Sequence, residues 1–278
     1  MVLSIAINSV IIIFILNMLK YFALVIEYKG TSYCGWQRQN HSDSVQKYVE
    51  KTLSIVADEV ITVVCAGRTD AGVHATAQVV HFSTNAVRTK KSWMLGVNSH
   101  LPIDIKVSEI YEVSSNFSAR FSALYRRYQY VIYQNKTSSA LWHAHTTWIN
   151  QKLDLKLMNE ASHFLLGEQD FSAFRSSKCQ SMSSDRNIHH AYFKQYGKFI
   201  VFDIKGNAFL HHMVRNIMGS LVNIGLRKKR ACWIKTLIAL KDRTKAGITV
   251  RPEGLYLVAV GYPSELGIDA YQAVPFIF

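Results

Sequence analysis

Residues 66–74 read AGRTDAGVH, a mostly polar stretch between two short apolar segments, 61–65 and 78–82. Both flanking segments are rich in β-branched or aromatic residues, which is typical of β-strands. Gly67 and Gly72 stand at the two ends of the sequence Arg-Thr-Asp-Ala, and glycine allows both positive φ angles and the close approach of a ligand. The stretch therefore predicts a strand–loop–strand unit whose loop is a candidate functional site.

The charges of this loop favour a chemical role. Arg68 and Asp70 place a cation and a carboxylate two residues apart. The alternative is a tight turn in which Asp70 hydrogen-bonds to its own backbone, as aspartate often does. A phosphate-binding P-loop is excluded, because that motif needs Lys directly after its second glycine and Val73 stands there.

The apolar residues of the remaining chain follow two spacings, one typical of strands and one typical of helices. Strands are predicted at 21–28, 61–65, 78–82, 105–113, 126–133, 188–196, 199–206 and 254–262. Helices are predicted at 45–56, 92–98, 155–166, 209–222 and 233–240, the third with Gly167 as its C-cap. Because these elements do not alternate strictly as βαβ units, the fold class is predicted to be α+β with a mixed, largely antiparallel sheet.

The order of these segments predicts the domain organisation. Residues 20–115 form an N-terminal half with the candidate loop, 116–263 form a C-terminal half, and 264–278 form a tail. No low-complexity linker separates the halves, so we expect one continuous structure. Residues 1–19 are an apolar extension, and 2–19 carry no charge.

Three interpretations of the extension compete: a membrane anchor, a core element, or a stretch upstream of a true start at Met18. The last is favoured, because the run has neither the positive n-region nor the small-residue cleavage site of a signal peptide. We therefore expect no membrane association.

The charge balance predicts a polyanionic partner. The chain of 278 residues has 32 Lys and Arg against 19 Asp and Glu, a formal net charge of +13. Such a basic protein usually meets nucleic acid, an acidic membrane face or an acidic protein, although a compositional bias of the host is the alternative. With only 4 Pro and 14 Gly, the collagen-like and Pro/Gly-rich disordered classes are excluded.

The cysteines and histidines do not predict a metal site. The four cysteines, at 34, 65, 179 and 232, form no CxxC pair and are expected to be free thiols in a reducing cytoplasm. Two pairs of adjacent histidines occur, at 189–190 and 211–212. Adjacent residues of a helix or strand point in different directions, so neither pair is expected to bind a metal ion together.

Two further residues are candidates on pattern alone. Tyr128 lies in a predicted strand between Arg127 and Gln129, and such interleaving suits base stacking with phosphate contact, although a buried core aromatic fits equally. Arg215 lies in the apolar stripe of 209–222. It either pairs with a carboxylate near the core or extends to solvent.

Taken together, these strings resemble the tRNA pseudouridine synthase A family. The resemblance runs in family order from about Tyr21 to Tyr262. The matching strings are 33–39 (YCGWQRQ), 66–74 (AGRTDAGVH), 78–82 (QVVHF), 119–121 (ARF) with 126–128 (RRY), 170–175 (DFSAFR), 208–219 and 253–260 (EGLYLVAV). The string AGRTDAGVH is highly specific to this family.

The resemblance implies a pseudouridine synthase fold of two similar halves with helices packed on a shared sheet. It implies a cytoplasmic homodimer that isomerises uridine to pseudouridine in the tRNA anticodon stem-loop, at positions 38, 39 and 40 of standard tRNA numbering, with tRNA running across both subunits. No metal or organic cofactor is expected. A non-catalytic RNA-binding protein on the same scaffold is the alternative, but it would not need a carboxylate facing a phosphodiester.

The resemblance also assigns roles to individual residues. Asp70 matches the catalytic aspartate, and Arg68 matches the arginine that helps flip the target base and fills its place in the stack. Tyr128 matches the tyrosine packed against that base, and Arg215 matches the arginine paired with the carboxylate. The remaining expected substrate-binding residues are Arg88, Phe117, Arg120, Lys178 and Gln180.

Two chemistries fit the expected carboxylate. It can attack C1′ as a nucleophile, or it can act as a base at C2′ through a glycal intermediate. Ser118 stands where the family usually has His, which concerns one tRNA contact and not the chemistry.

Overall fold

The computed structural model describes residues 19–271, so the predicted extension before Met18 and the last residues of the predicted tail lie outside the described part. Its centre is a 10-stranded sheet with the order β4-β1-β3-β10-β5-β9-β8-β7, while β2 pairs with β3 and β6 pairs with β5. Pairing is antiparallel except for β10 with β3 and β5 with β6. The predicted α+β class with a mixed, largely antiparallel sheet is confirmed.

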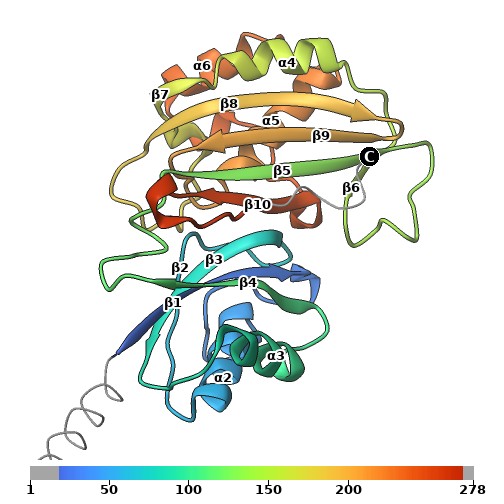
Figure 1. Ribbon diagram of the computed structural model, residues 1–278. Helices are drawn as coiled ribbons and strands as arrows, with labels where there is room; N and C mark the ends of the chain where they lie inside the picture. Colours follow the sequence, from blue (N-terminus) through green and yellow to red (C-terminus); the bar gives the residue numbers. More distant parts are fainter. Residues whose placement is uncertain (1–18, 272–278) are drawn as a thin grey trace, which may run out of the picture.

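The N-terminal half contains four strands and two helices (Figure 1). They are β1 (Lys20–Tyr28), α2 (Val45–Ala57), β2 (Val64–Cys65), β3 (His74–Thr84), α3 (Lys90–His100) and β4 (Ile105–Val113). β1 lies between β3 and β4, and its Phe22 ring packs on Trp93 of α3 with centroids 5.8 Å apart. Buried residues of α2, such as Leu53, belong to the same hydrophobic cluster.

The C-terminal half contains the remaining six strands and three helices. They are β5 (Tyr125–Gln134), β6 (Thr147–Ile149), α4 (Leu155–His163), β7 (Gly167–Asp170), β8 (Asp185–Tyr196), β9 (Phe199–Gly206), α5 (Met213–Gly225), α6 (Trp233–Leu240) and β10 (Leu255–Gly261). Helix α4 packs on β8 and on α5.

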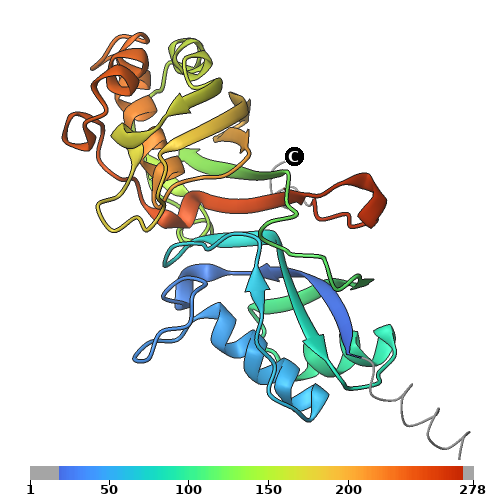
Figure 2. The same ribbon diagram turned by 90° about the vertical axis from the view of Figure 1, so that its left-hand side faces the viewer.

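The two halves meet where β10 lies against β3. Residues Tyr256 and Leu257 of β10 pair in parallel with His74 and Ala75 at the start of β3, while the other edge of β10 pairs with β5. The turned view shows β10 along the boundary between the halves, which carry their helices at opposite ends (Figure 2). One large hydrophobic cluster spans both halves, so the sheet brings the start of β3 next to the C-terminal elements.

Two local predictions are wrong. Gly167 does not cap α4, which ends at His163; with a φ of +84° it is the first residue of β7. The predicted helix of 209–222 begins only at Met213, because His212 takes a left-handed conformation with a φ of +61°. The second difference shapes the functional site.

The predicted tail folds back on the sheet as far as the structure describes it. The backbone N–H of Val260 donates to the carbonyl of Ala270 at 3.0 Å, and Tyr271 forms a bridge with Ala259. Arg127 lies over the ring of Tyr271, 5.1 Å from its centroid. Within residues 19–271, no helix has the length and apolar character needed to cross a membrane.

Candidate active site

Asp70 lies in the loop that joins β2 to β3, and the segment before α2 fixes that loop. The N–H of Trp36 donates to the carbonyl of Thr69 at 3.0 Å, and the Thr69 hydroxyl contacts the Tyr28 hydroxyl at 2.7 Å. Gly35 has a φ of +85°, and a Cβ there would lie 2.7 Å from the Thr69 carbonyl oxygen. Only glycine therefore allows this close approach, which explains why the 33–39 string accompanies the loop.

The turn is made by the backbone of Asp70, so its side chain is released for other contacts. The N–H of Val73 donates to the Asp70 carbonyl at 3.1 Å, and Gly72 takes a φ of +78°. The carboxylate instead points toward the C-terminal half. The sequence-based alternative, in which the Asp70 side chain caps its own turn, does not describe this geometry.

Arg215, in the first turn of α5, meets this carboxylate. Its Nη1 donates to Asp70 Oδ2 at 3.0 Å, and its Nε donates to the Val250 carbonyl at 2.9 Å. The side chains of Arg215 and Asp70 are 12% and 16% exposed respectively, so the pair is partly desolvated but still reaches solvent. The guanidinium is held at two points in this way, and it fixes the carboxylate through a charge-assisted hydrogen bond.

Tyr128 lies on β5 next to the loop. Its side chain is buried and its ring meets Phe209 edge-to-face, with centroids 5.1 Å apart. Burial raises the pKa of the Tyr128 hydroxyl far above its usual value; nearby Arg126 lowers this pKa and Asp70 raises it, so the phenol stays protonated. A Cβ on Gly67 would lie 3.8 Å from the hydroxyl oxygen, which places that oxygen beside the loop.

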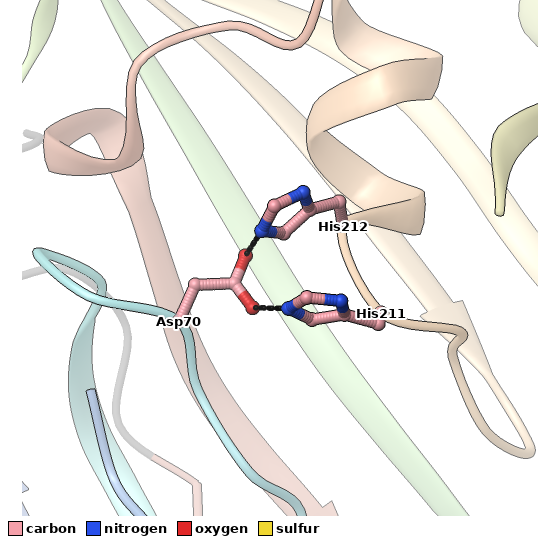
Figure 3. A group of neighbouring side chains, drawn as sticks. All are labelled: Asp70, His211 and His212. Carbon is pink, nitrogen blue, oxygen red and sulfur yellow. Dashed lines mark ion pairs between the residues drawn. The ribbon is translucent and has the colours of Figure 1, made fainter. Parts of the chain in front are cut away.

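His211 and His212 complete the surroundings of Asp70, and sequence reasoning missed both (Figure 3). His211 Nε2 lies 3.4 Å from Oδ1, and His212 Nε2 lies 3.5 Å from Oδ2. The expectation that adjacent imidazoles diverge is wrong for this pair, because the left-handed backbone of His212 turns both rings to one side, with centroids 4.0 Å apart. No sequence signal marked this change, because the apolar pattern from Phe209 predicts a helix that already includes both histidines.

Both histidines are partly buried, unlike a pair on an open surface. Burial lowers the pKa of His212, and the neighbouring Asp70 carboxylate only partly offsets this effect, so its imidazole is neutral at neutral pH. His211 Nδ1 is buried without a hydrogen-bond partner among the described residues. Asp70, His211 and His212 each offer one possible metal-ligand atom, and these atoms all lie within 4.8 Å of one another.

Arg126 is a further residue of the site to which the sequence analysis assigned no role. Its buried guanidinium donates from Nη2 to the carbonyl of Ala66 at 2.8 Å and to the carbonyl of Arg120 at 2.6 Å, and from Nη1 to that of Asn207 at 2.9 Å. It therefore ties the start of the Asp70 loop to two segments of the other half. Its place on the same strand face as Tyr128 was the available signal.

Four exposed residues expected to contact substrate lie around the loop. Arg68 donates from Nη1 to Gln180 Oε1 at 3.2 Å, which joins two of these candidates across 112 residues of sequence. The guanidinium of Arg120 lies over the Phe121 ring at 5.1 Å. Lys178 is exposed on the same segment as Gln180.

Phe117 and Arg88 lie elsewhere. Phe117 is 4% exposed, packed between His81 and Tyr262, and the exposed aromatic of that segment is Phe121. Arg88 is exposed but follows the end of β3, whereas the Asp70 loop precedes its start. An 11-residue strand at about 3.4 Å per residue puts about 35 Å between the two ends.

A carboxylate that is held by one arginine and bordered by exposed basic side chains is typical of an enzyme site that acts on a polyanion. Comparison with known proteins sharpens this class. The model of the family described as tRNA pseudouridine synthase matches residues 24–122 and 161–263, more than half of the chain. The chain belongs to this tRNA pseudouridine synthase family.

Curated relatives agree with the family model. Proteins named tRNA pseudouridine synthase A from Francisella tularensis subsp. mediasiatica and Francisella philomiragia are 53% and 52% identical over 245 residues. Each alignment covers 88% of this chain and 95% of the relative. Among solved structures, a Cbf5-Nop10-Gar1 complex matches with a TM-score of 0.35 and 10% identity, over 85% of this chain and 49% of that chain.

Proposed function

We propose that this enzyme isomerises uridine to pseudouridine in the anticodon stem-loop of tRNA, at positions 38, 39 and 40, with Asp70 as the catalytic aspartate. The observation that carries the proposal is the position of that carboxylate. Arg215 holds one oxygen at 3.0 Å, while the Asp70 side chain keeps 16% of its surface exposed. The carboxylate is thus fixed by a cation, yet open to a substrate.

The reaction balances without a cofactor. The C1′–N1 bond breaks, the uracil rotates, and C5 bonds to C1′; N1 gains a proton and C5 loses one. Both candidate chemistries, attack at C1′ and proton removal at C2′, need an ionised carboxylate near the ribose. The contact between Arg215 and Asp70 supplies a stabilising charge for that ionised form in either case.

The target uridine must first leave its stack, at a cost of a few kcal/mol. Arg68, exposed beside Asp70 and already bonded to Gln180, can enter the vacated place with its planar guanidinium. Tyr128, held against Phe209, supplies a flat apolar wall for the extruded base. Loop and strand thus provide complementary roles: one displaces the base and the other receives it.

A long, charged substrate accounts for the spread of basic residues. Exposed Arg120 and Lys178 lie near the loop, whereas Arg88 lies about 35 Å along β3. Residues so far apart contact different parts of one tRNA, or the tRNA bound at the other subunit of a homodimer. The net charge of +13 agrees with binding of tRNA, and the four free cysteines agree with the proposed cytoplasmic location.

The test is to incubate the purified full chain with an unmodified tRNA and map pseudouridine chemically at single-nucleotide resolution. We expect signal at 38, 39 or 40 wherever the tRNA has uridine, and none in a transcript with those uridines replaced by cytidine. Pseudouridine confined to other regions of the tRNA would refute the assigned positions. Comparison of tRNA from cells with and without the gene tests the same assignment in vivo.

A further inference from the structure

The contacts between Asp70 and the two histidines are too long for strong hydrogen bonds. Charge-assisted N–H···O bonds measure about 2.7–2.9 Å, whereas the two Nε2···O distances here are 3.4 and 3.5 Å. These distances instead fit the spacing between two ligands of one metal ion. Two ligands about 2.0–2.1 Å from a tetrahedral zinc ion lie about 3.3–3.4 Å from each other. Each Nε2 stands at about this spacing from its own oxygen of the carboxylate, His211 from Oδ1 and His212 from Oδ2.

The donors are also of the right chemical kind. Two imidazole Nε2 atoms and a carboxylate are a common protein donor set for zinc, and the three donors here lie within 4.8 Å of one another. They converge from two loops, the β2–β3 loop and the residues before α5, as Figure 3 shows. Because the side chains of His211, His212 and Asp70 are 37%, 29% and 16% exposed, water can reach the site and fill a fourth position.

We propose that Asp70, His211 and His212 form a binding site for a divalent transition-metal ion of the zinc class, and that the bound ion inhibits the enzyme. The ion would take the carboxylate that the reaction requires, and it would compete with Arg215 for Oδ2. This second part rests on the proposed function, whereas metal binding does not. The bound ion is thus proposed as an inhibitor, and the reaction itself does not require it.

Three features make the site weak and its occupancy reversible. The Arg215 guanidinium lies 3.0 Å from Asp70 and repels a cation, and the chain has a net charge of +13. His211 Nδ1 is buried without a partner among the described residues, whereas strong sites orient each imidazole through its second nitrogen. The ion would therefore bind when free metal rises and leave when it falls.

Binding is tested on the full chain with Co²⁺, whose visible absorption becomes intense in a tetrahedral site with nitrogen and oxygen ligands. The variants are His211→Gln and His212→Asn; Asn is chosen at 212 because it tolerates the left-handed backbone. The matched control is His189→Gln, which removes an exposed histidine from the other adjacent pair. We expect each site variant to weaken Co²⁺ binding about 10- to 100-fold, and the control to match wild type.

A thiol control separates this site from the cysteines. The backbone N–H of His211 donates to the sulfur of Cys179, so Cys179→Ser tests whether that thiol is the real ligand. Unchanged Co²⁺ binding by Cys179→Ser supports the proposal. The proposal would be overturned by loss of binding in that variant, by wild-type Co²⁺ affinity in the two histidine variants, or by the lack of a saturable Co²⁺ spectrum in wild type.

Inhibition is measured as single-turnover pseudouridine formation in an anticodon stem-loop. Zn²⁺ should slow wild type and His189→Gln equally, and a chelator should restore the rate. Because the Co²⁺ spectrum needs no RNA, a chain that binds metal but modifies no tRNA would refute the proposed function and keep the site. Metal binding at the site with no effect on turnover would refute the inhibitory role.

Discussion

Two aspartates in this protein are each surrounded by one arginine and by histidine, yet they differ in how fully they are bonded. Asp203, on β9, accepts four hydrogen bonds of 2.7–2.9 Å, from both sides of Arg127, from Gln129 and from His190, and its side chain is 4% exposed. Asp70 accepts one side-chain bond, 3.0 Å from Arg215, and is 16% exposed.

The difference separates a fully bonded carboxylate from one that is open to a further contact. The bonds to Asp203 join β5, β8 and β9, and all of its lone pairs are used, so it has nothing to offer a substrate. At Asp70 the Nε2 atoms of the two histidines lie 3.4 and 3.5 Å from the carboxylate oxygens, which leaves lone pairs of the carboxylate unused. Residue type alone does not distinguish the two clusters; the number and length of the hydrogen bonds do.

The comparison predicts its largest effect for Asp70→Asn. The amide is nearly isosteric and can still accept a bond from Arg215, but it is a poor nucleophile and cannot act as a base. We expect turnover to fall by about 10³-fold or more, while thermal stability and tRNA affinity stay close to wild type. Single-turnover conversion of an anticodon stem-loop measures the first, and filter binding measures the affinity. Substantial turnover by this variant would overturn the catalytic assignment.

Asp203→Asn should show the opposite profile. The substitution leaves the buried end of Arg127 without its bidentate partner, so we expect the free energy of unfolding to fall by about 3 kcal/mol. Turnover per folded molecule should match wild type. Urea unfolding measures the loss, with Asp43→Asn as the control, because Asp43 forms an exposed pair with Lys47. Equal stability of the Asp203 and Asp43 variants would contradict the structural role.

Substitutions of Arg215 should have intermediate effects on turnover and should depend on Asp70. Arg215→Ala removes the cation and should cost about 10²-fold, whereas Arg215→Lys keeps the charge without the planar fork and should cost about 10-fold. With Asn already at 70, removing Arg215 should cost little further activity, because both residues act on one step. The measurement is the four-member mutant cycle under single-turnover conditions. Fully additive losses would show that the two residues act separately.

Periodic patterns predicted the local elements well where the apolar residues are regular. The structure places β4 at Ile105–Val113 and α6 at Trp233–Leu240, the same bounds that the sequence spacing indicates. The long-range arrangement could not be read in this way. β10, the last strand, lies between β3 and β5, and this pairing depends on sheet topology rather than on any local pattern.

In the candidate site, too, the sequence predicted local features but not the contacts between distant segments. The glycines around Asp70 indicated a functional loop, but the contact between Asp70 and Arg215 spans 145 residues, and only the family resemblance indicated it beforehand. The histidines were missed because the apolar stripe from Phe209 suggested a helix that had already begun. The left-handed backbone at His212 delays the helix and turns both rings to the carboxylate.

The pH dependence of stability gives the smallest effect and the sharpest check on Asp203. Burial acts to raise the pKa of this carboxyl, but the hydrogen bonds from His190, Arg127 and Gln129 outweigh it and lower the pKa from 3.8 to about 2. A carboxyl whose pKa is lower in the folded chain stabilises the fold above its unfolded pKa, and this contribution is lost as pH falls toward 2. The full contribution is about 2 kcal/mol, and about 1 kcal/mol of it should be gone by pH 3.

Because other carboxyls titrate in the same range, the quantity to measure is the difference in unfolding free energy between wild type and Asp203→Asn. That difference should be constant between pH 5 and 7 and should narrow below pH 4. A gap that keeps its size down to pH 3 would mean that the bonds around Asp203 do not favour its ionised form.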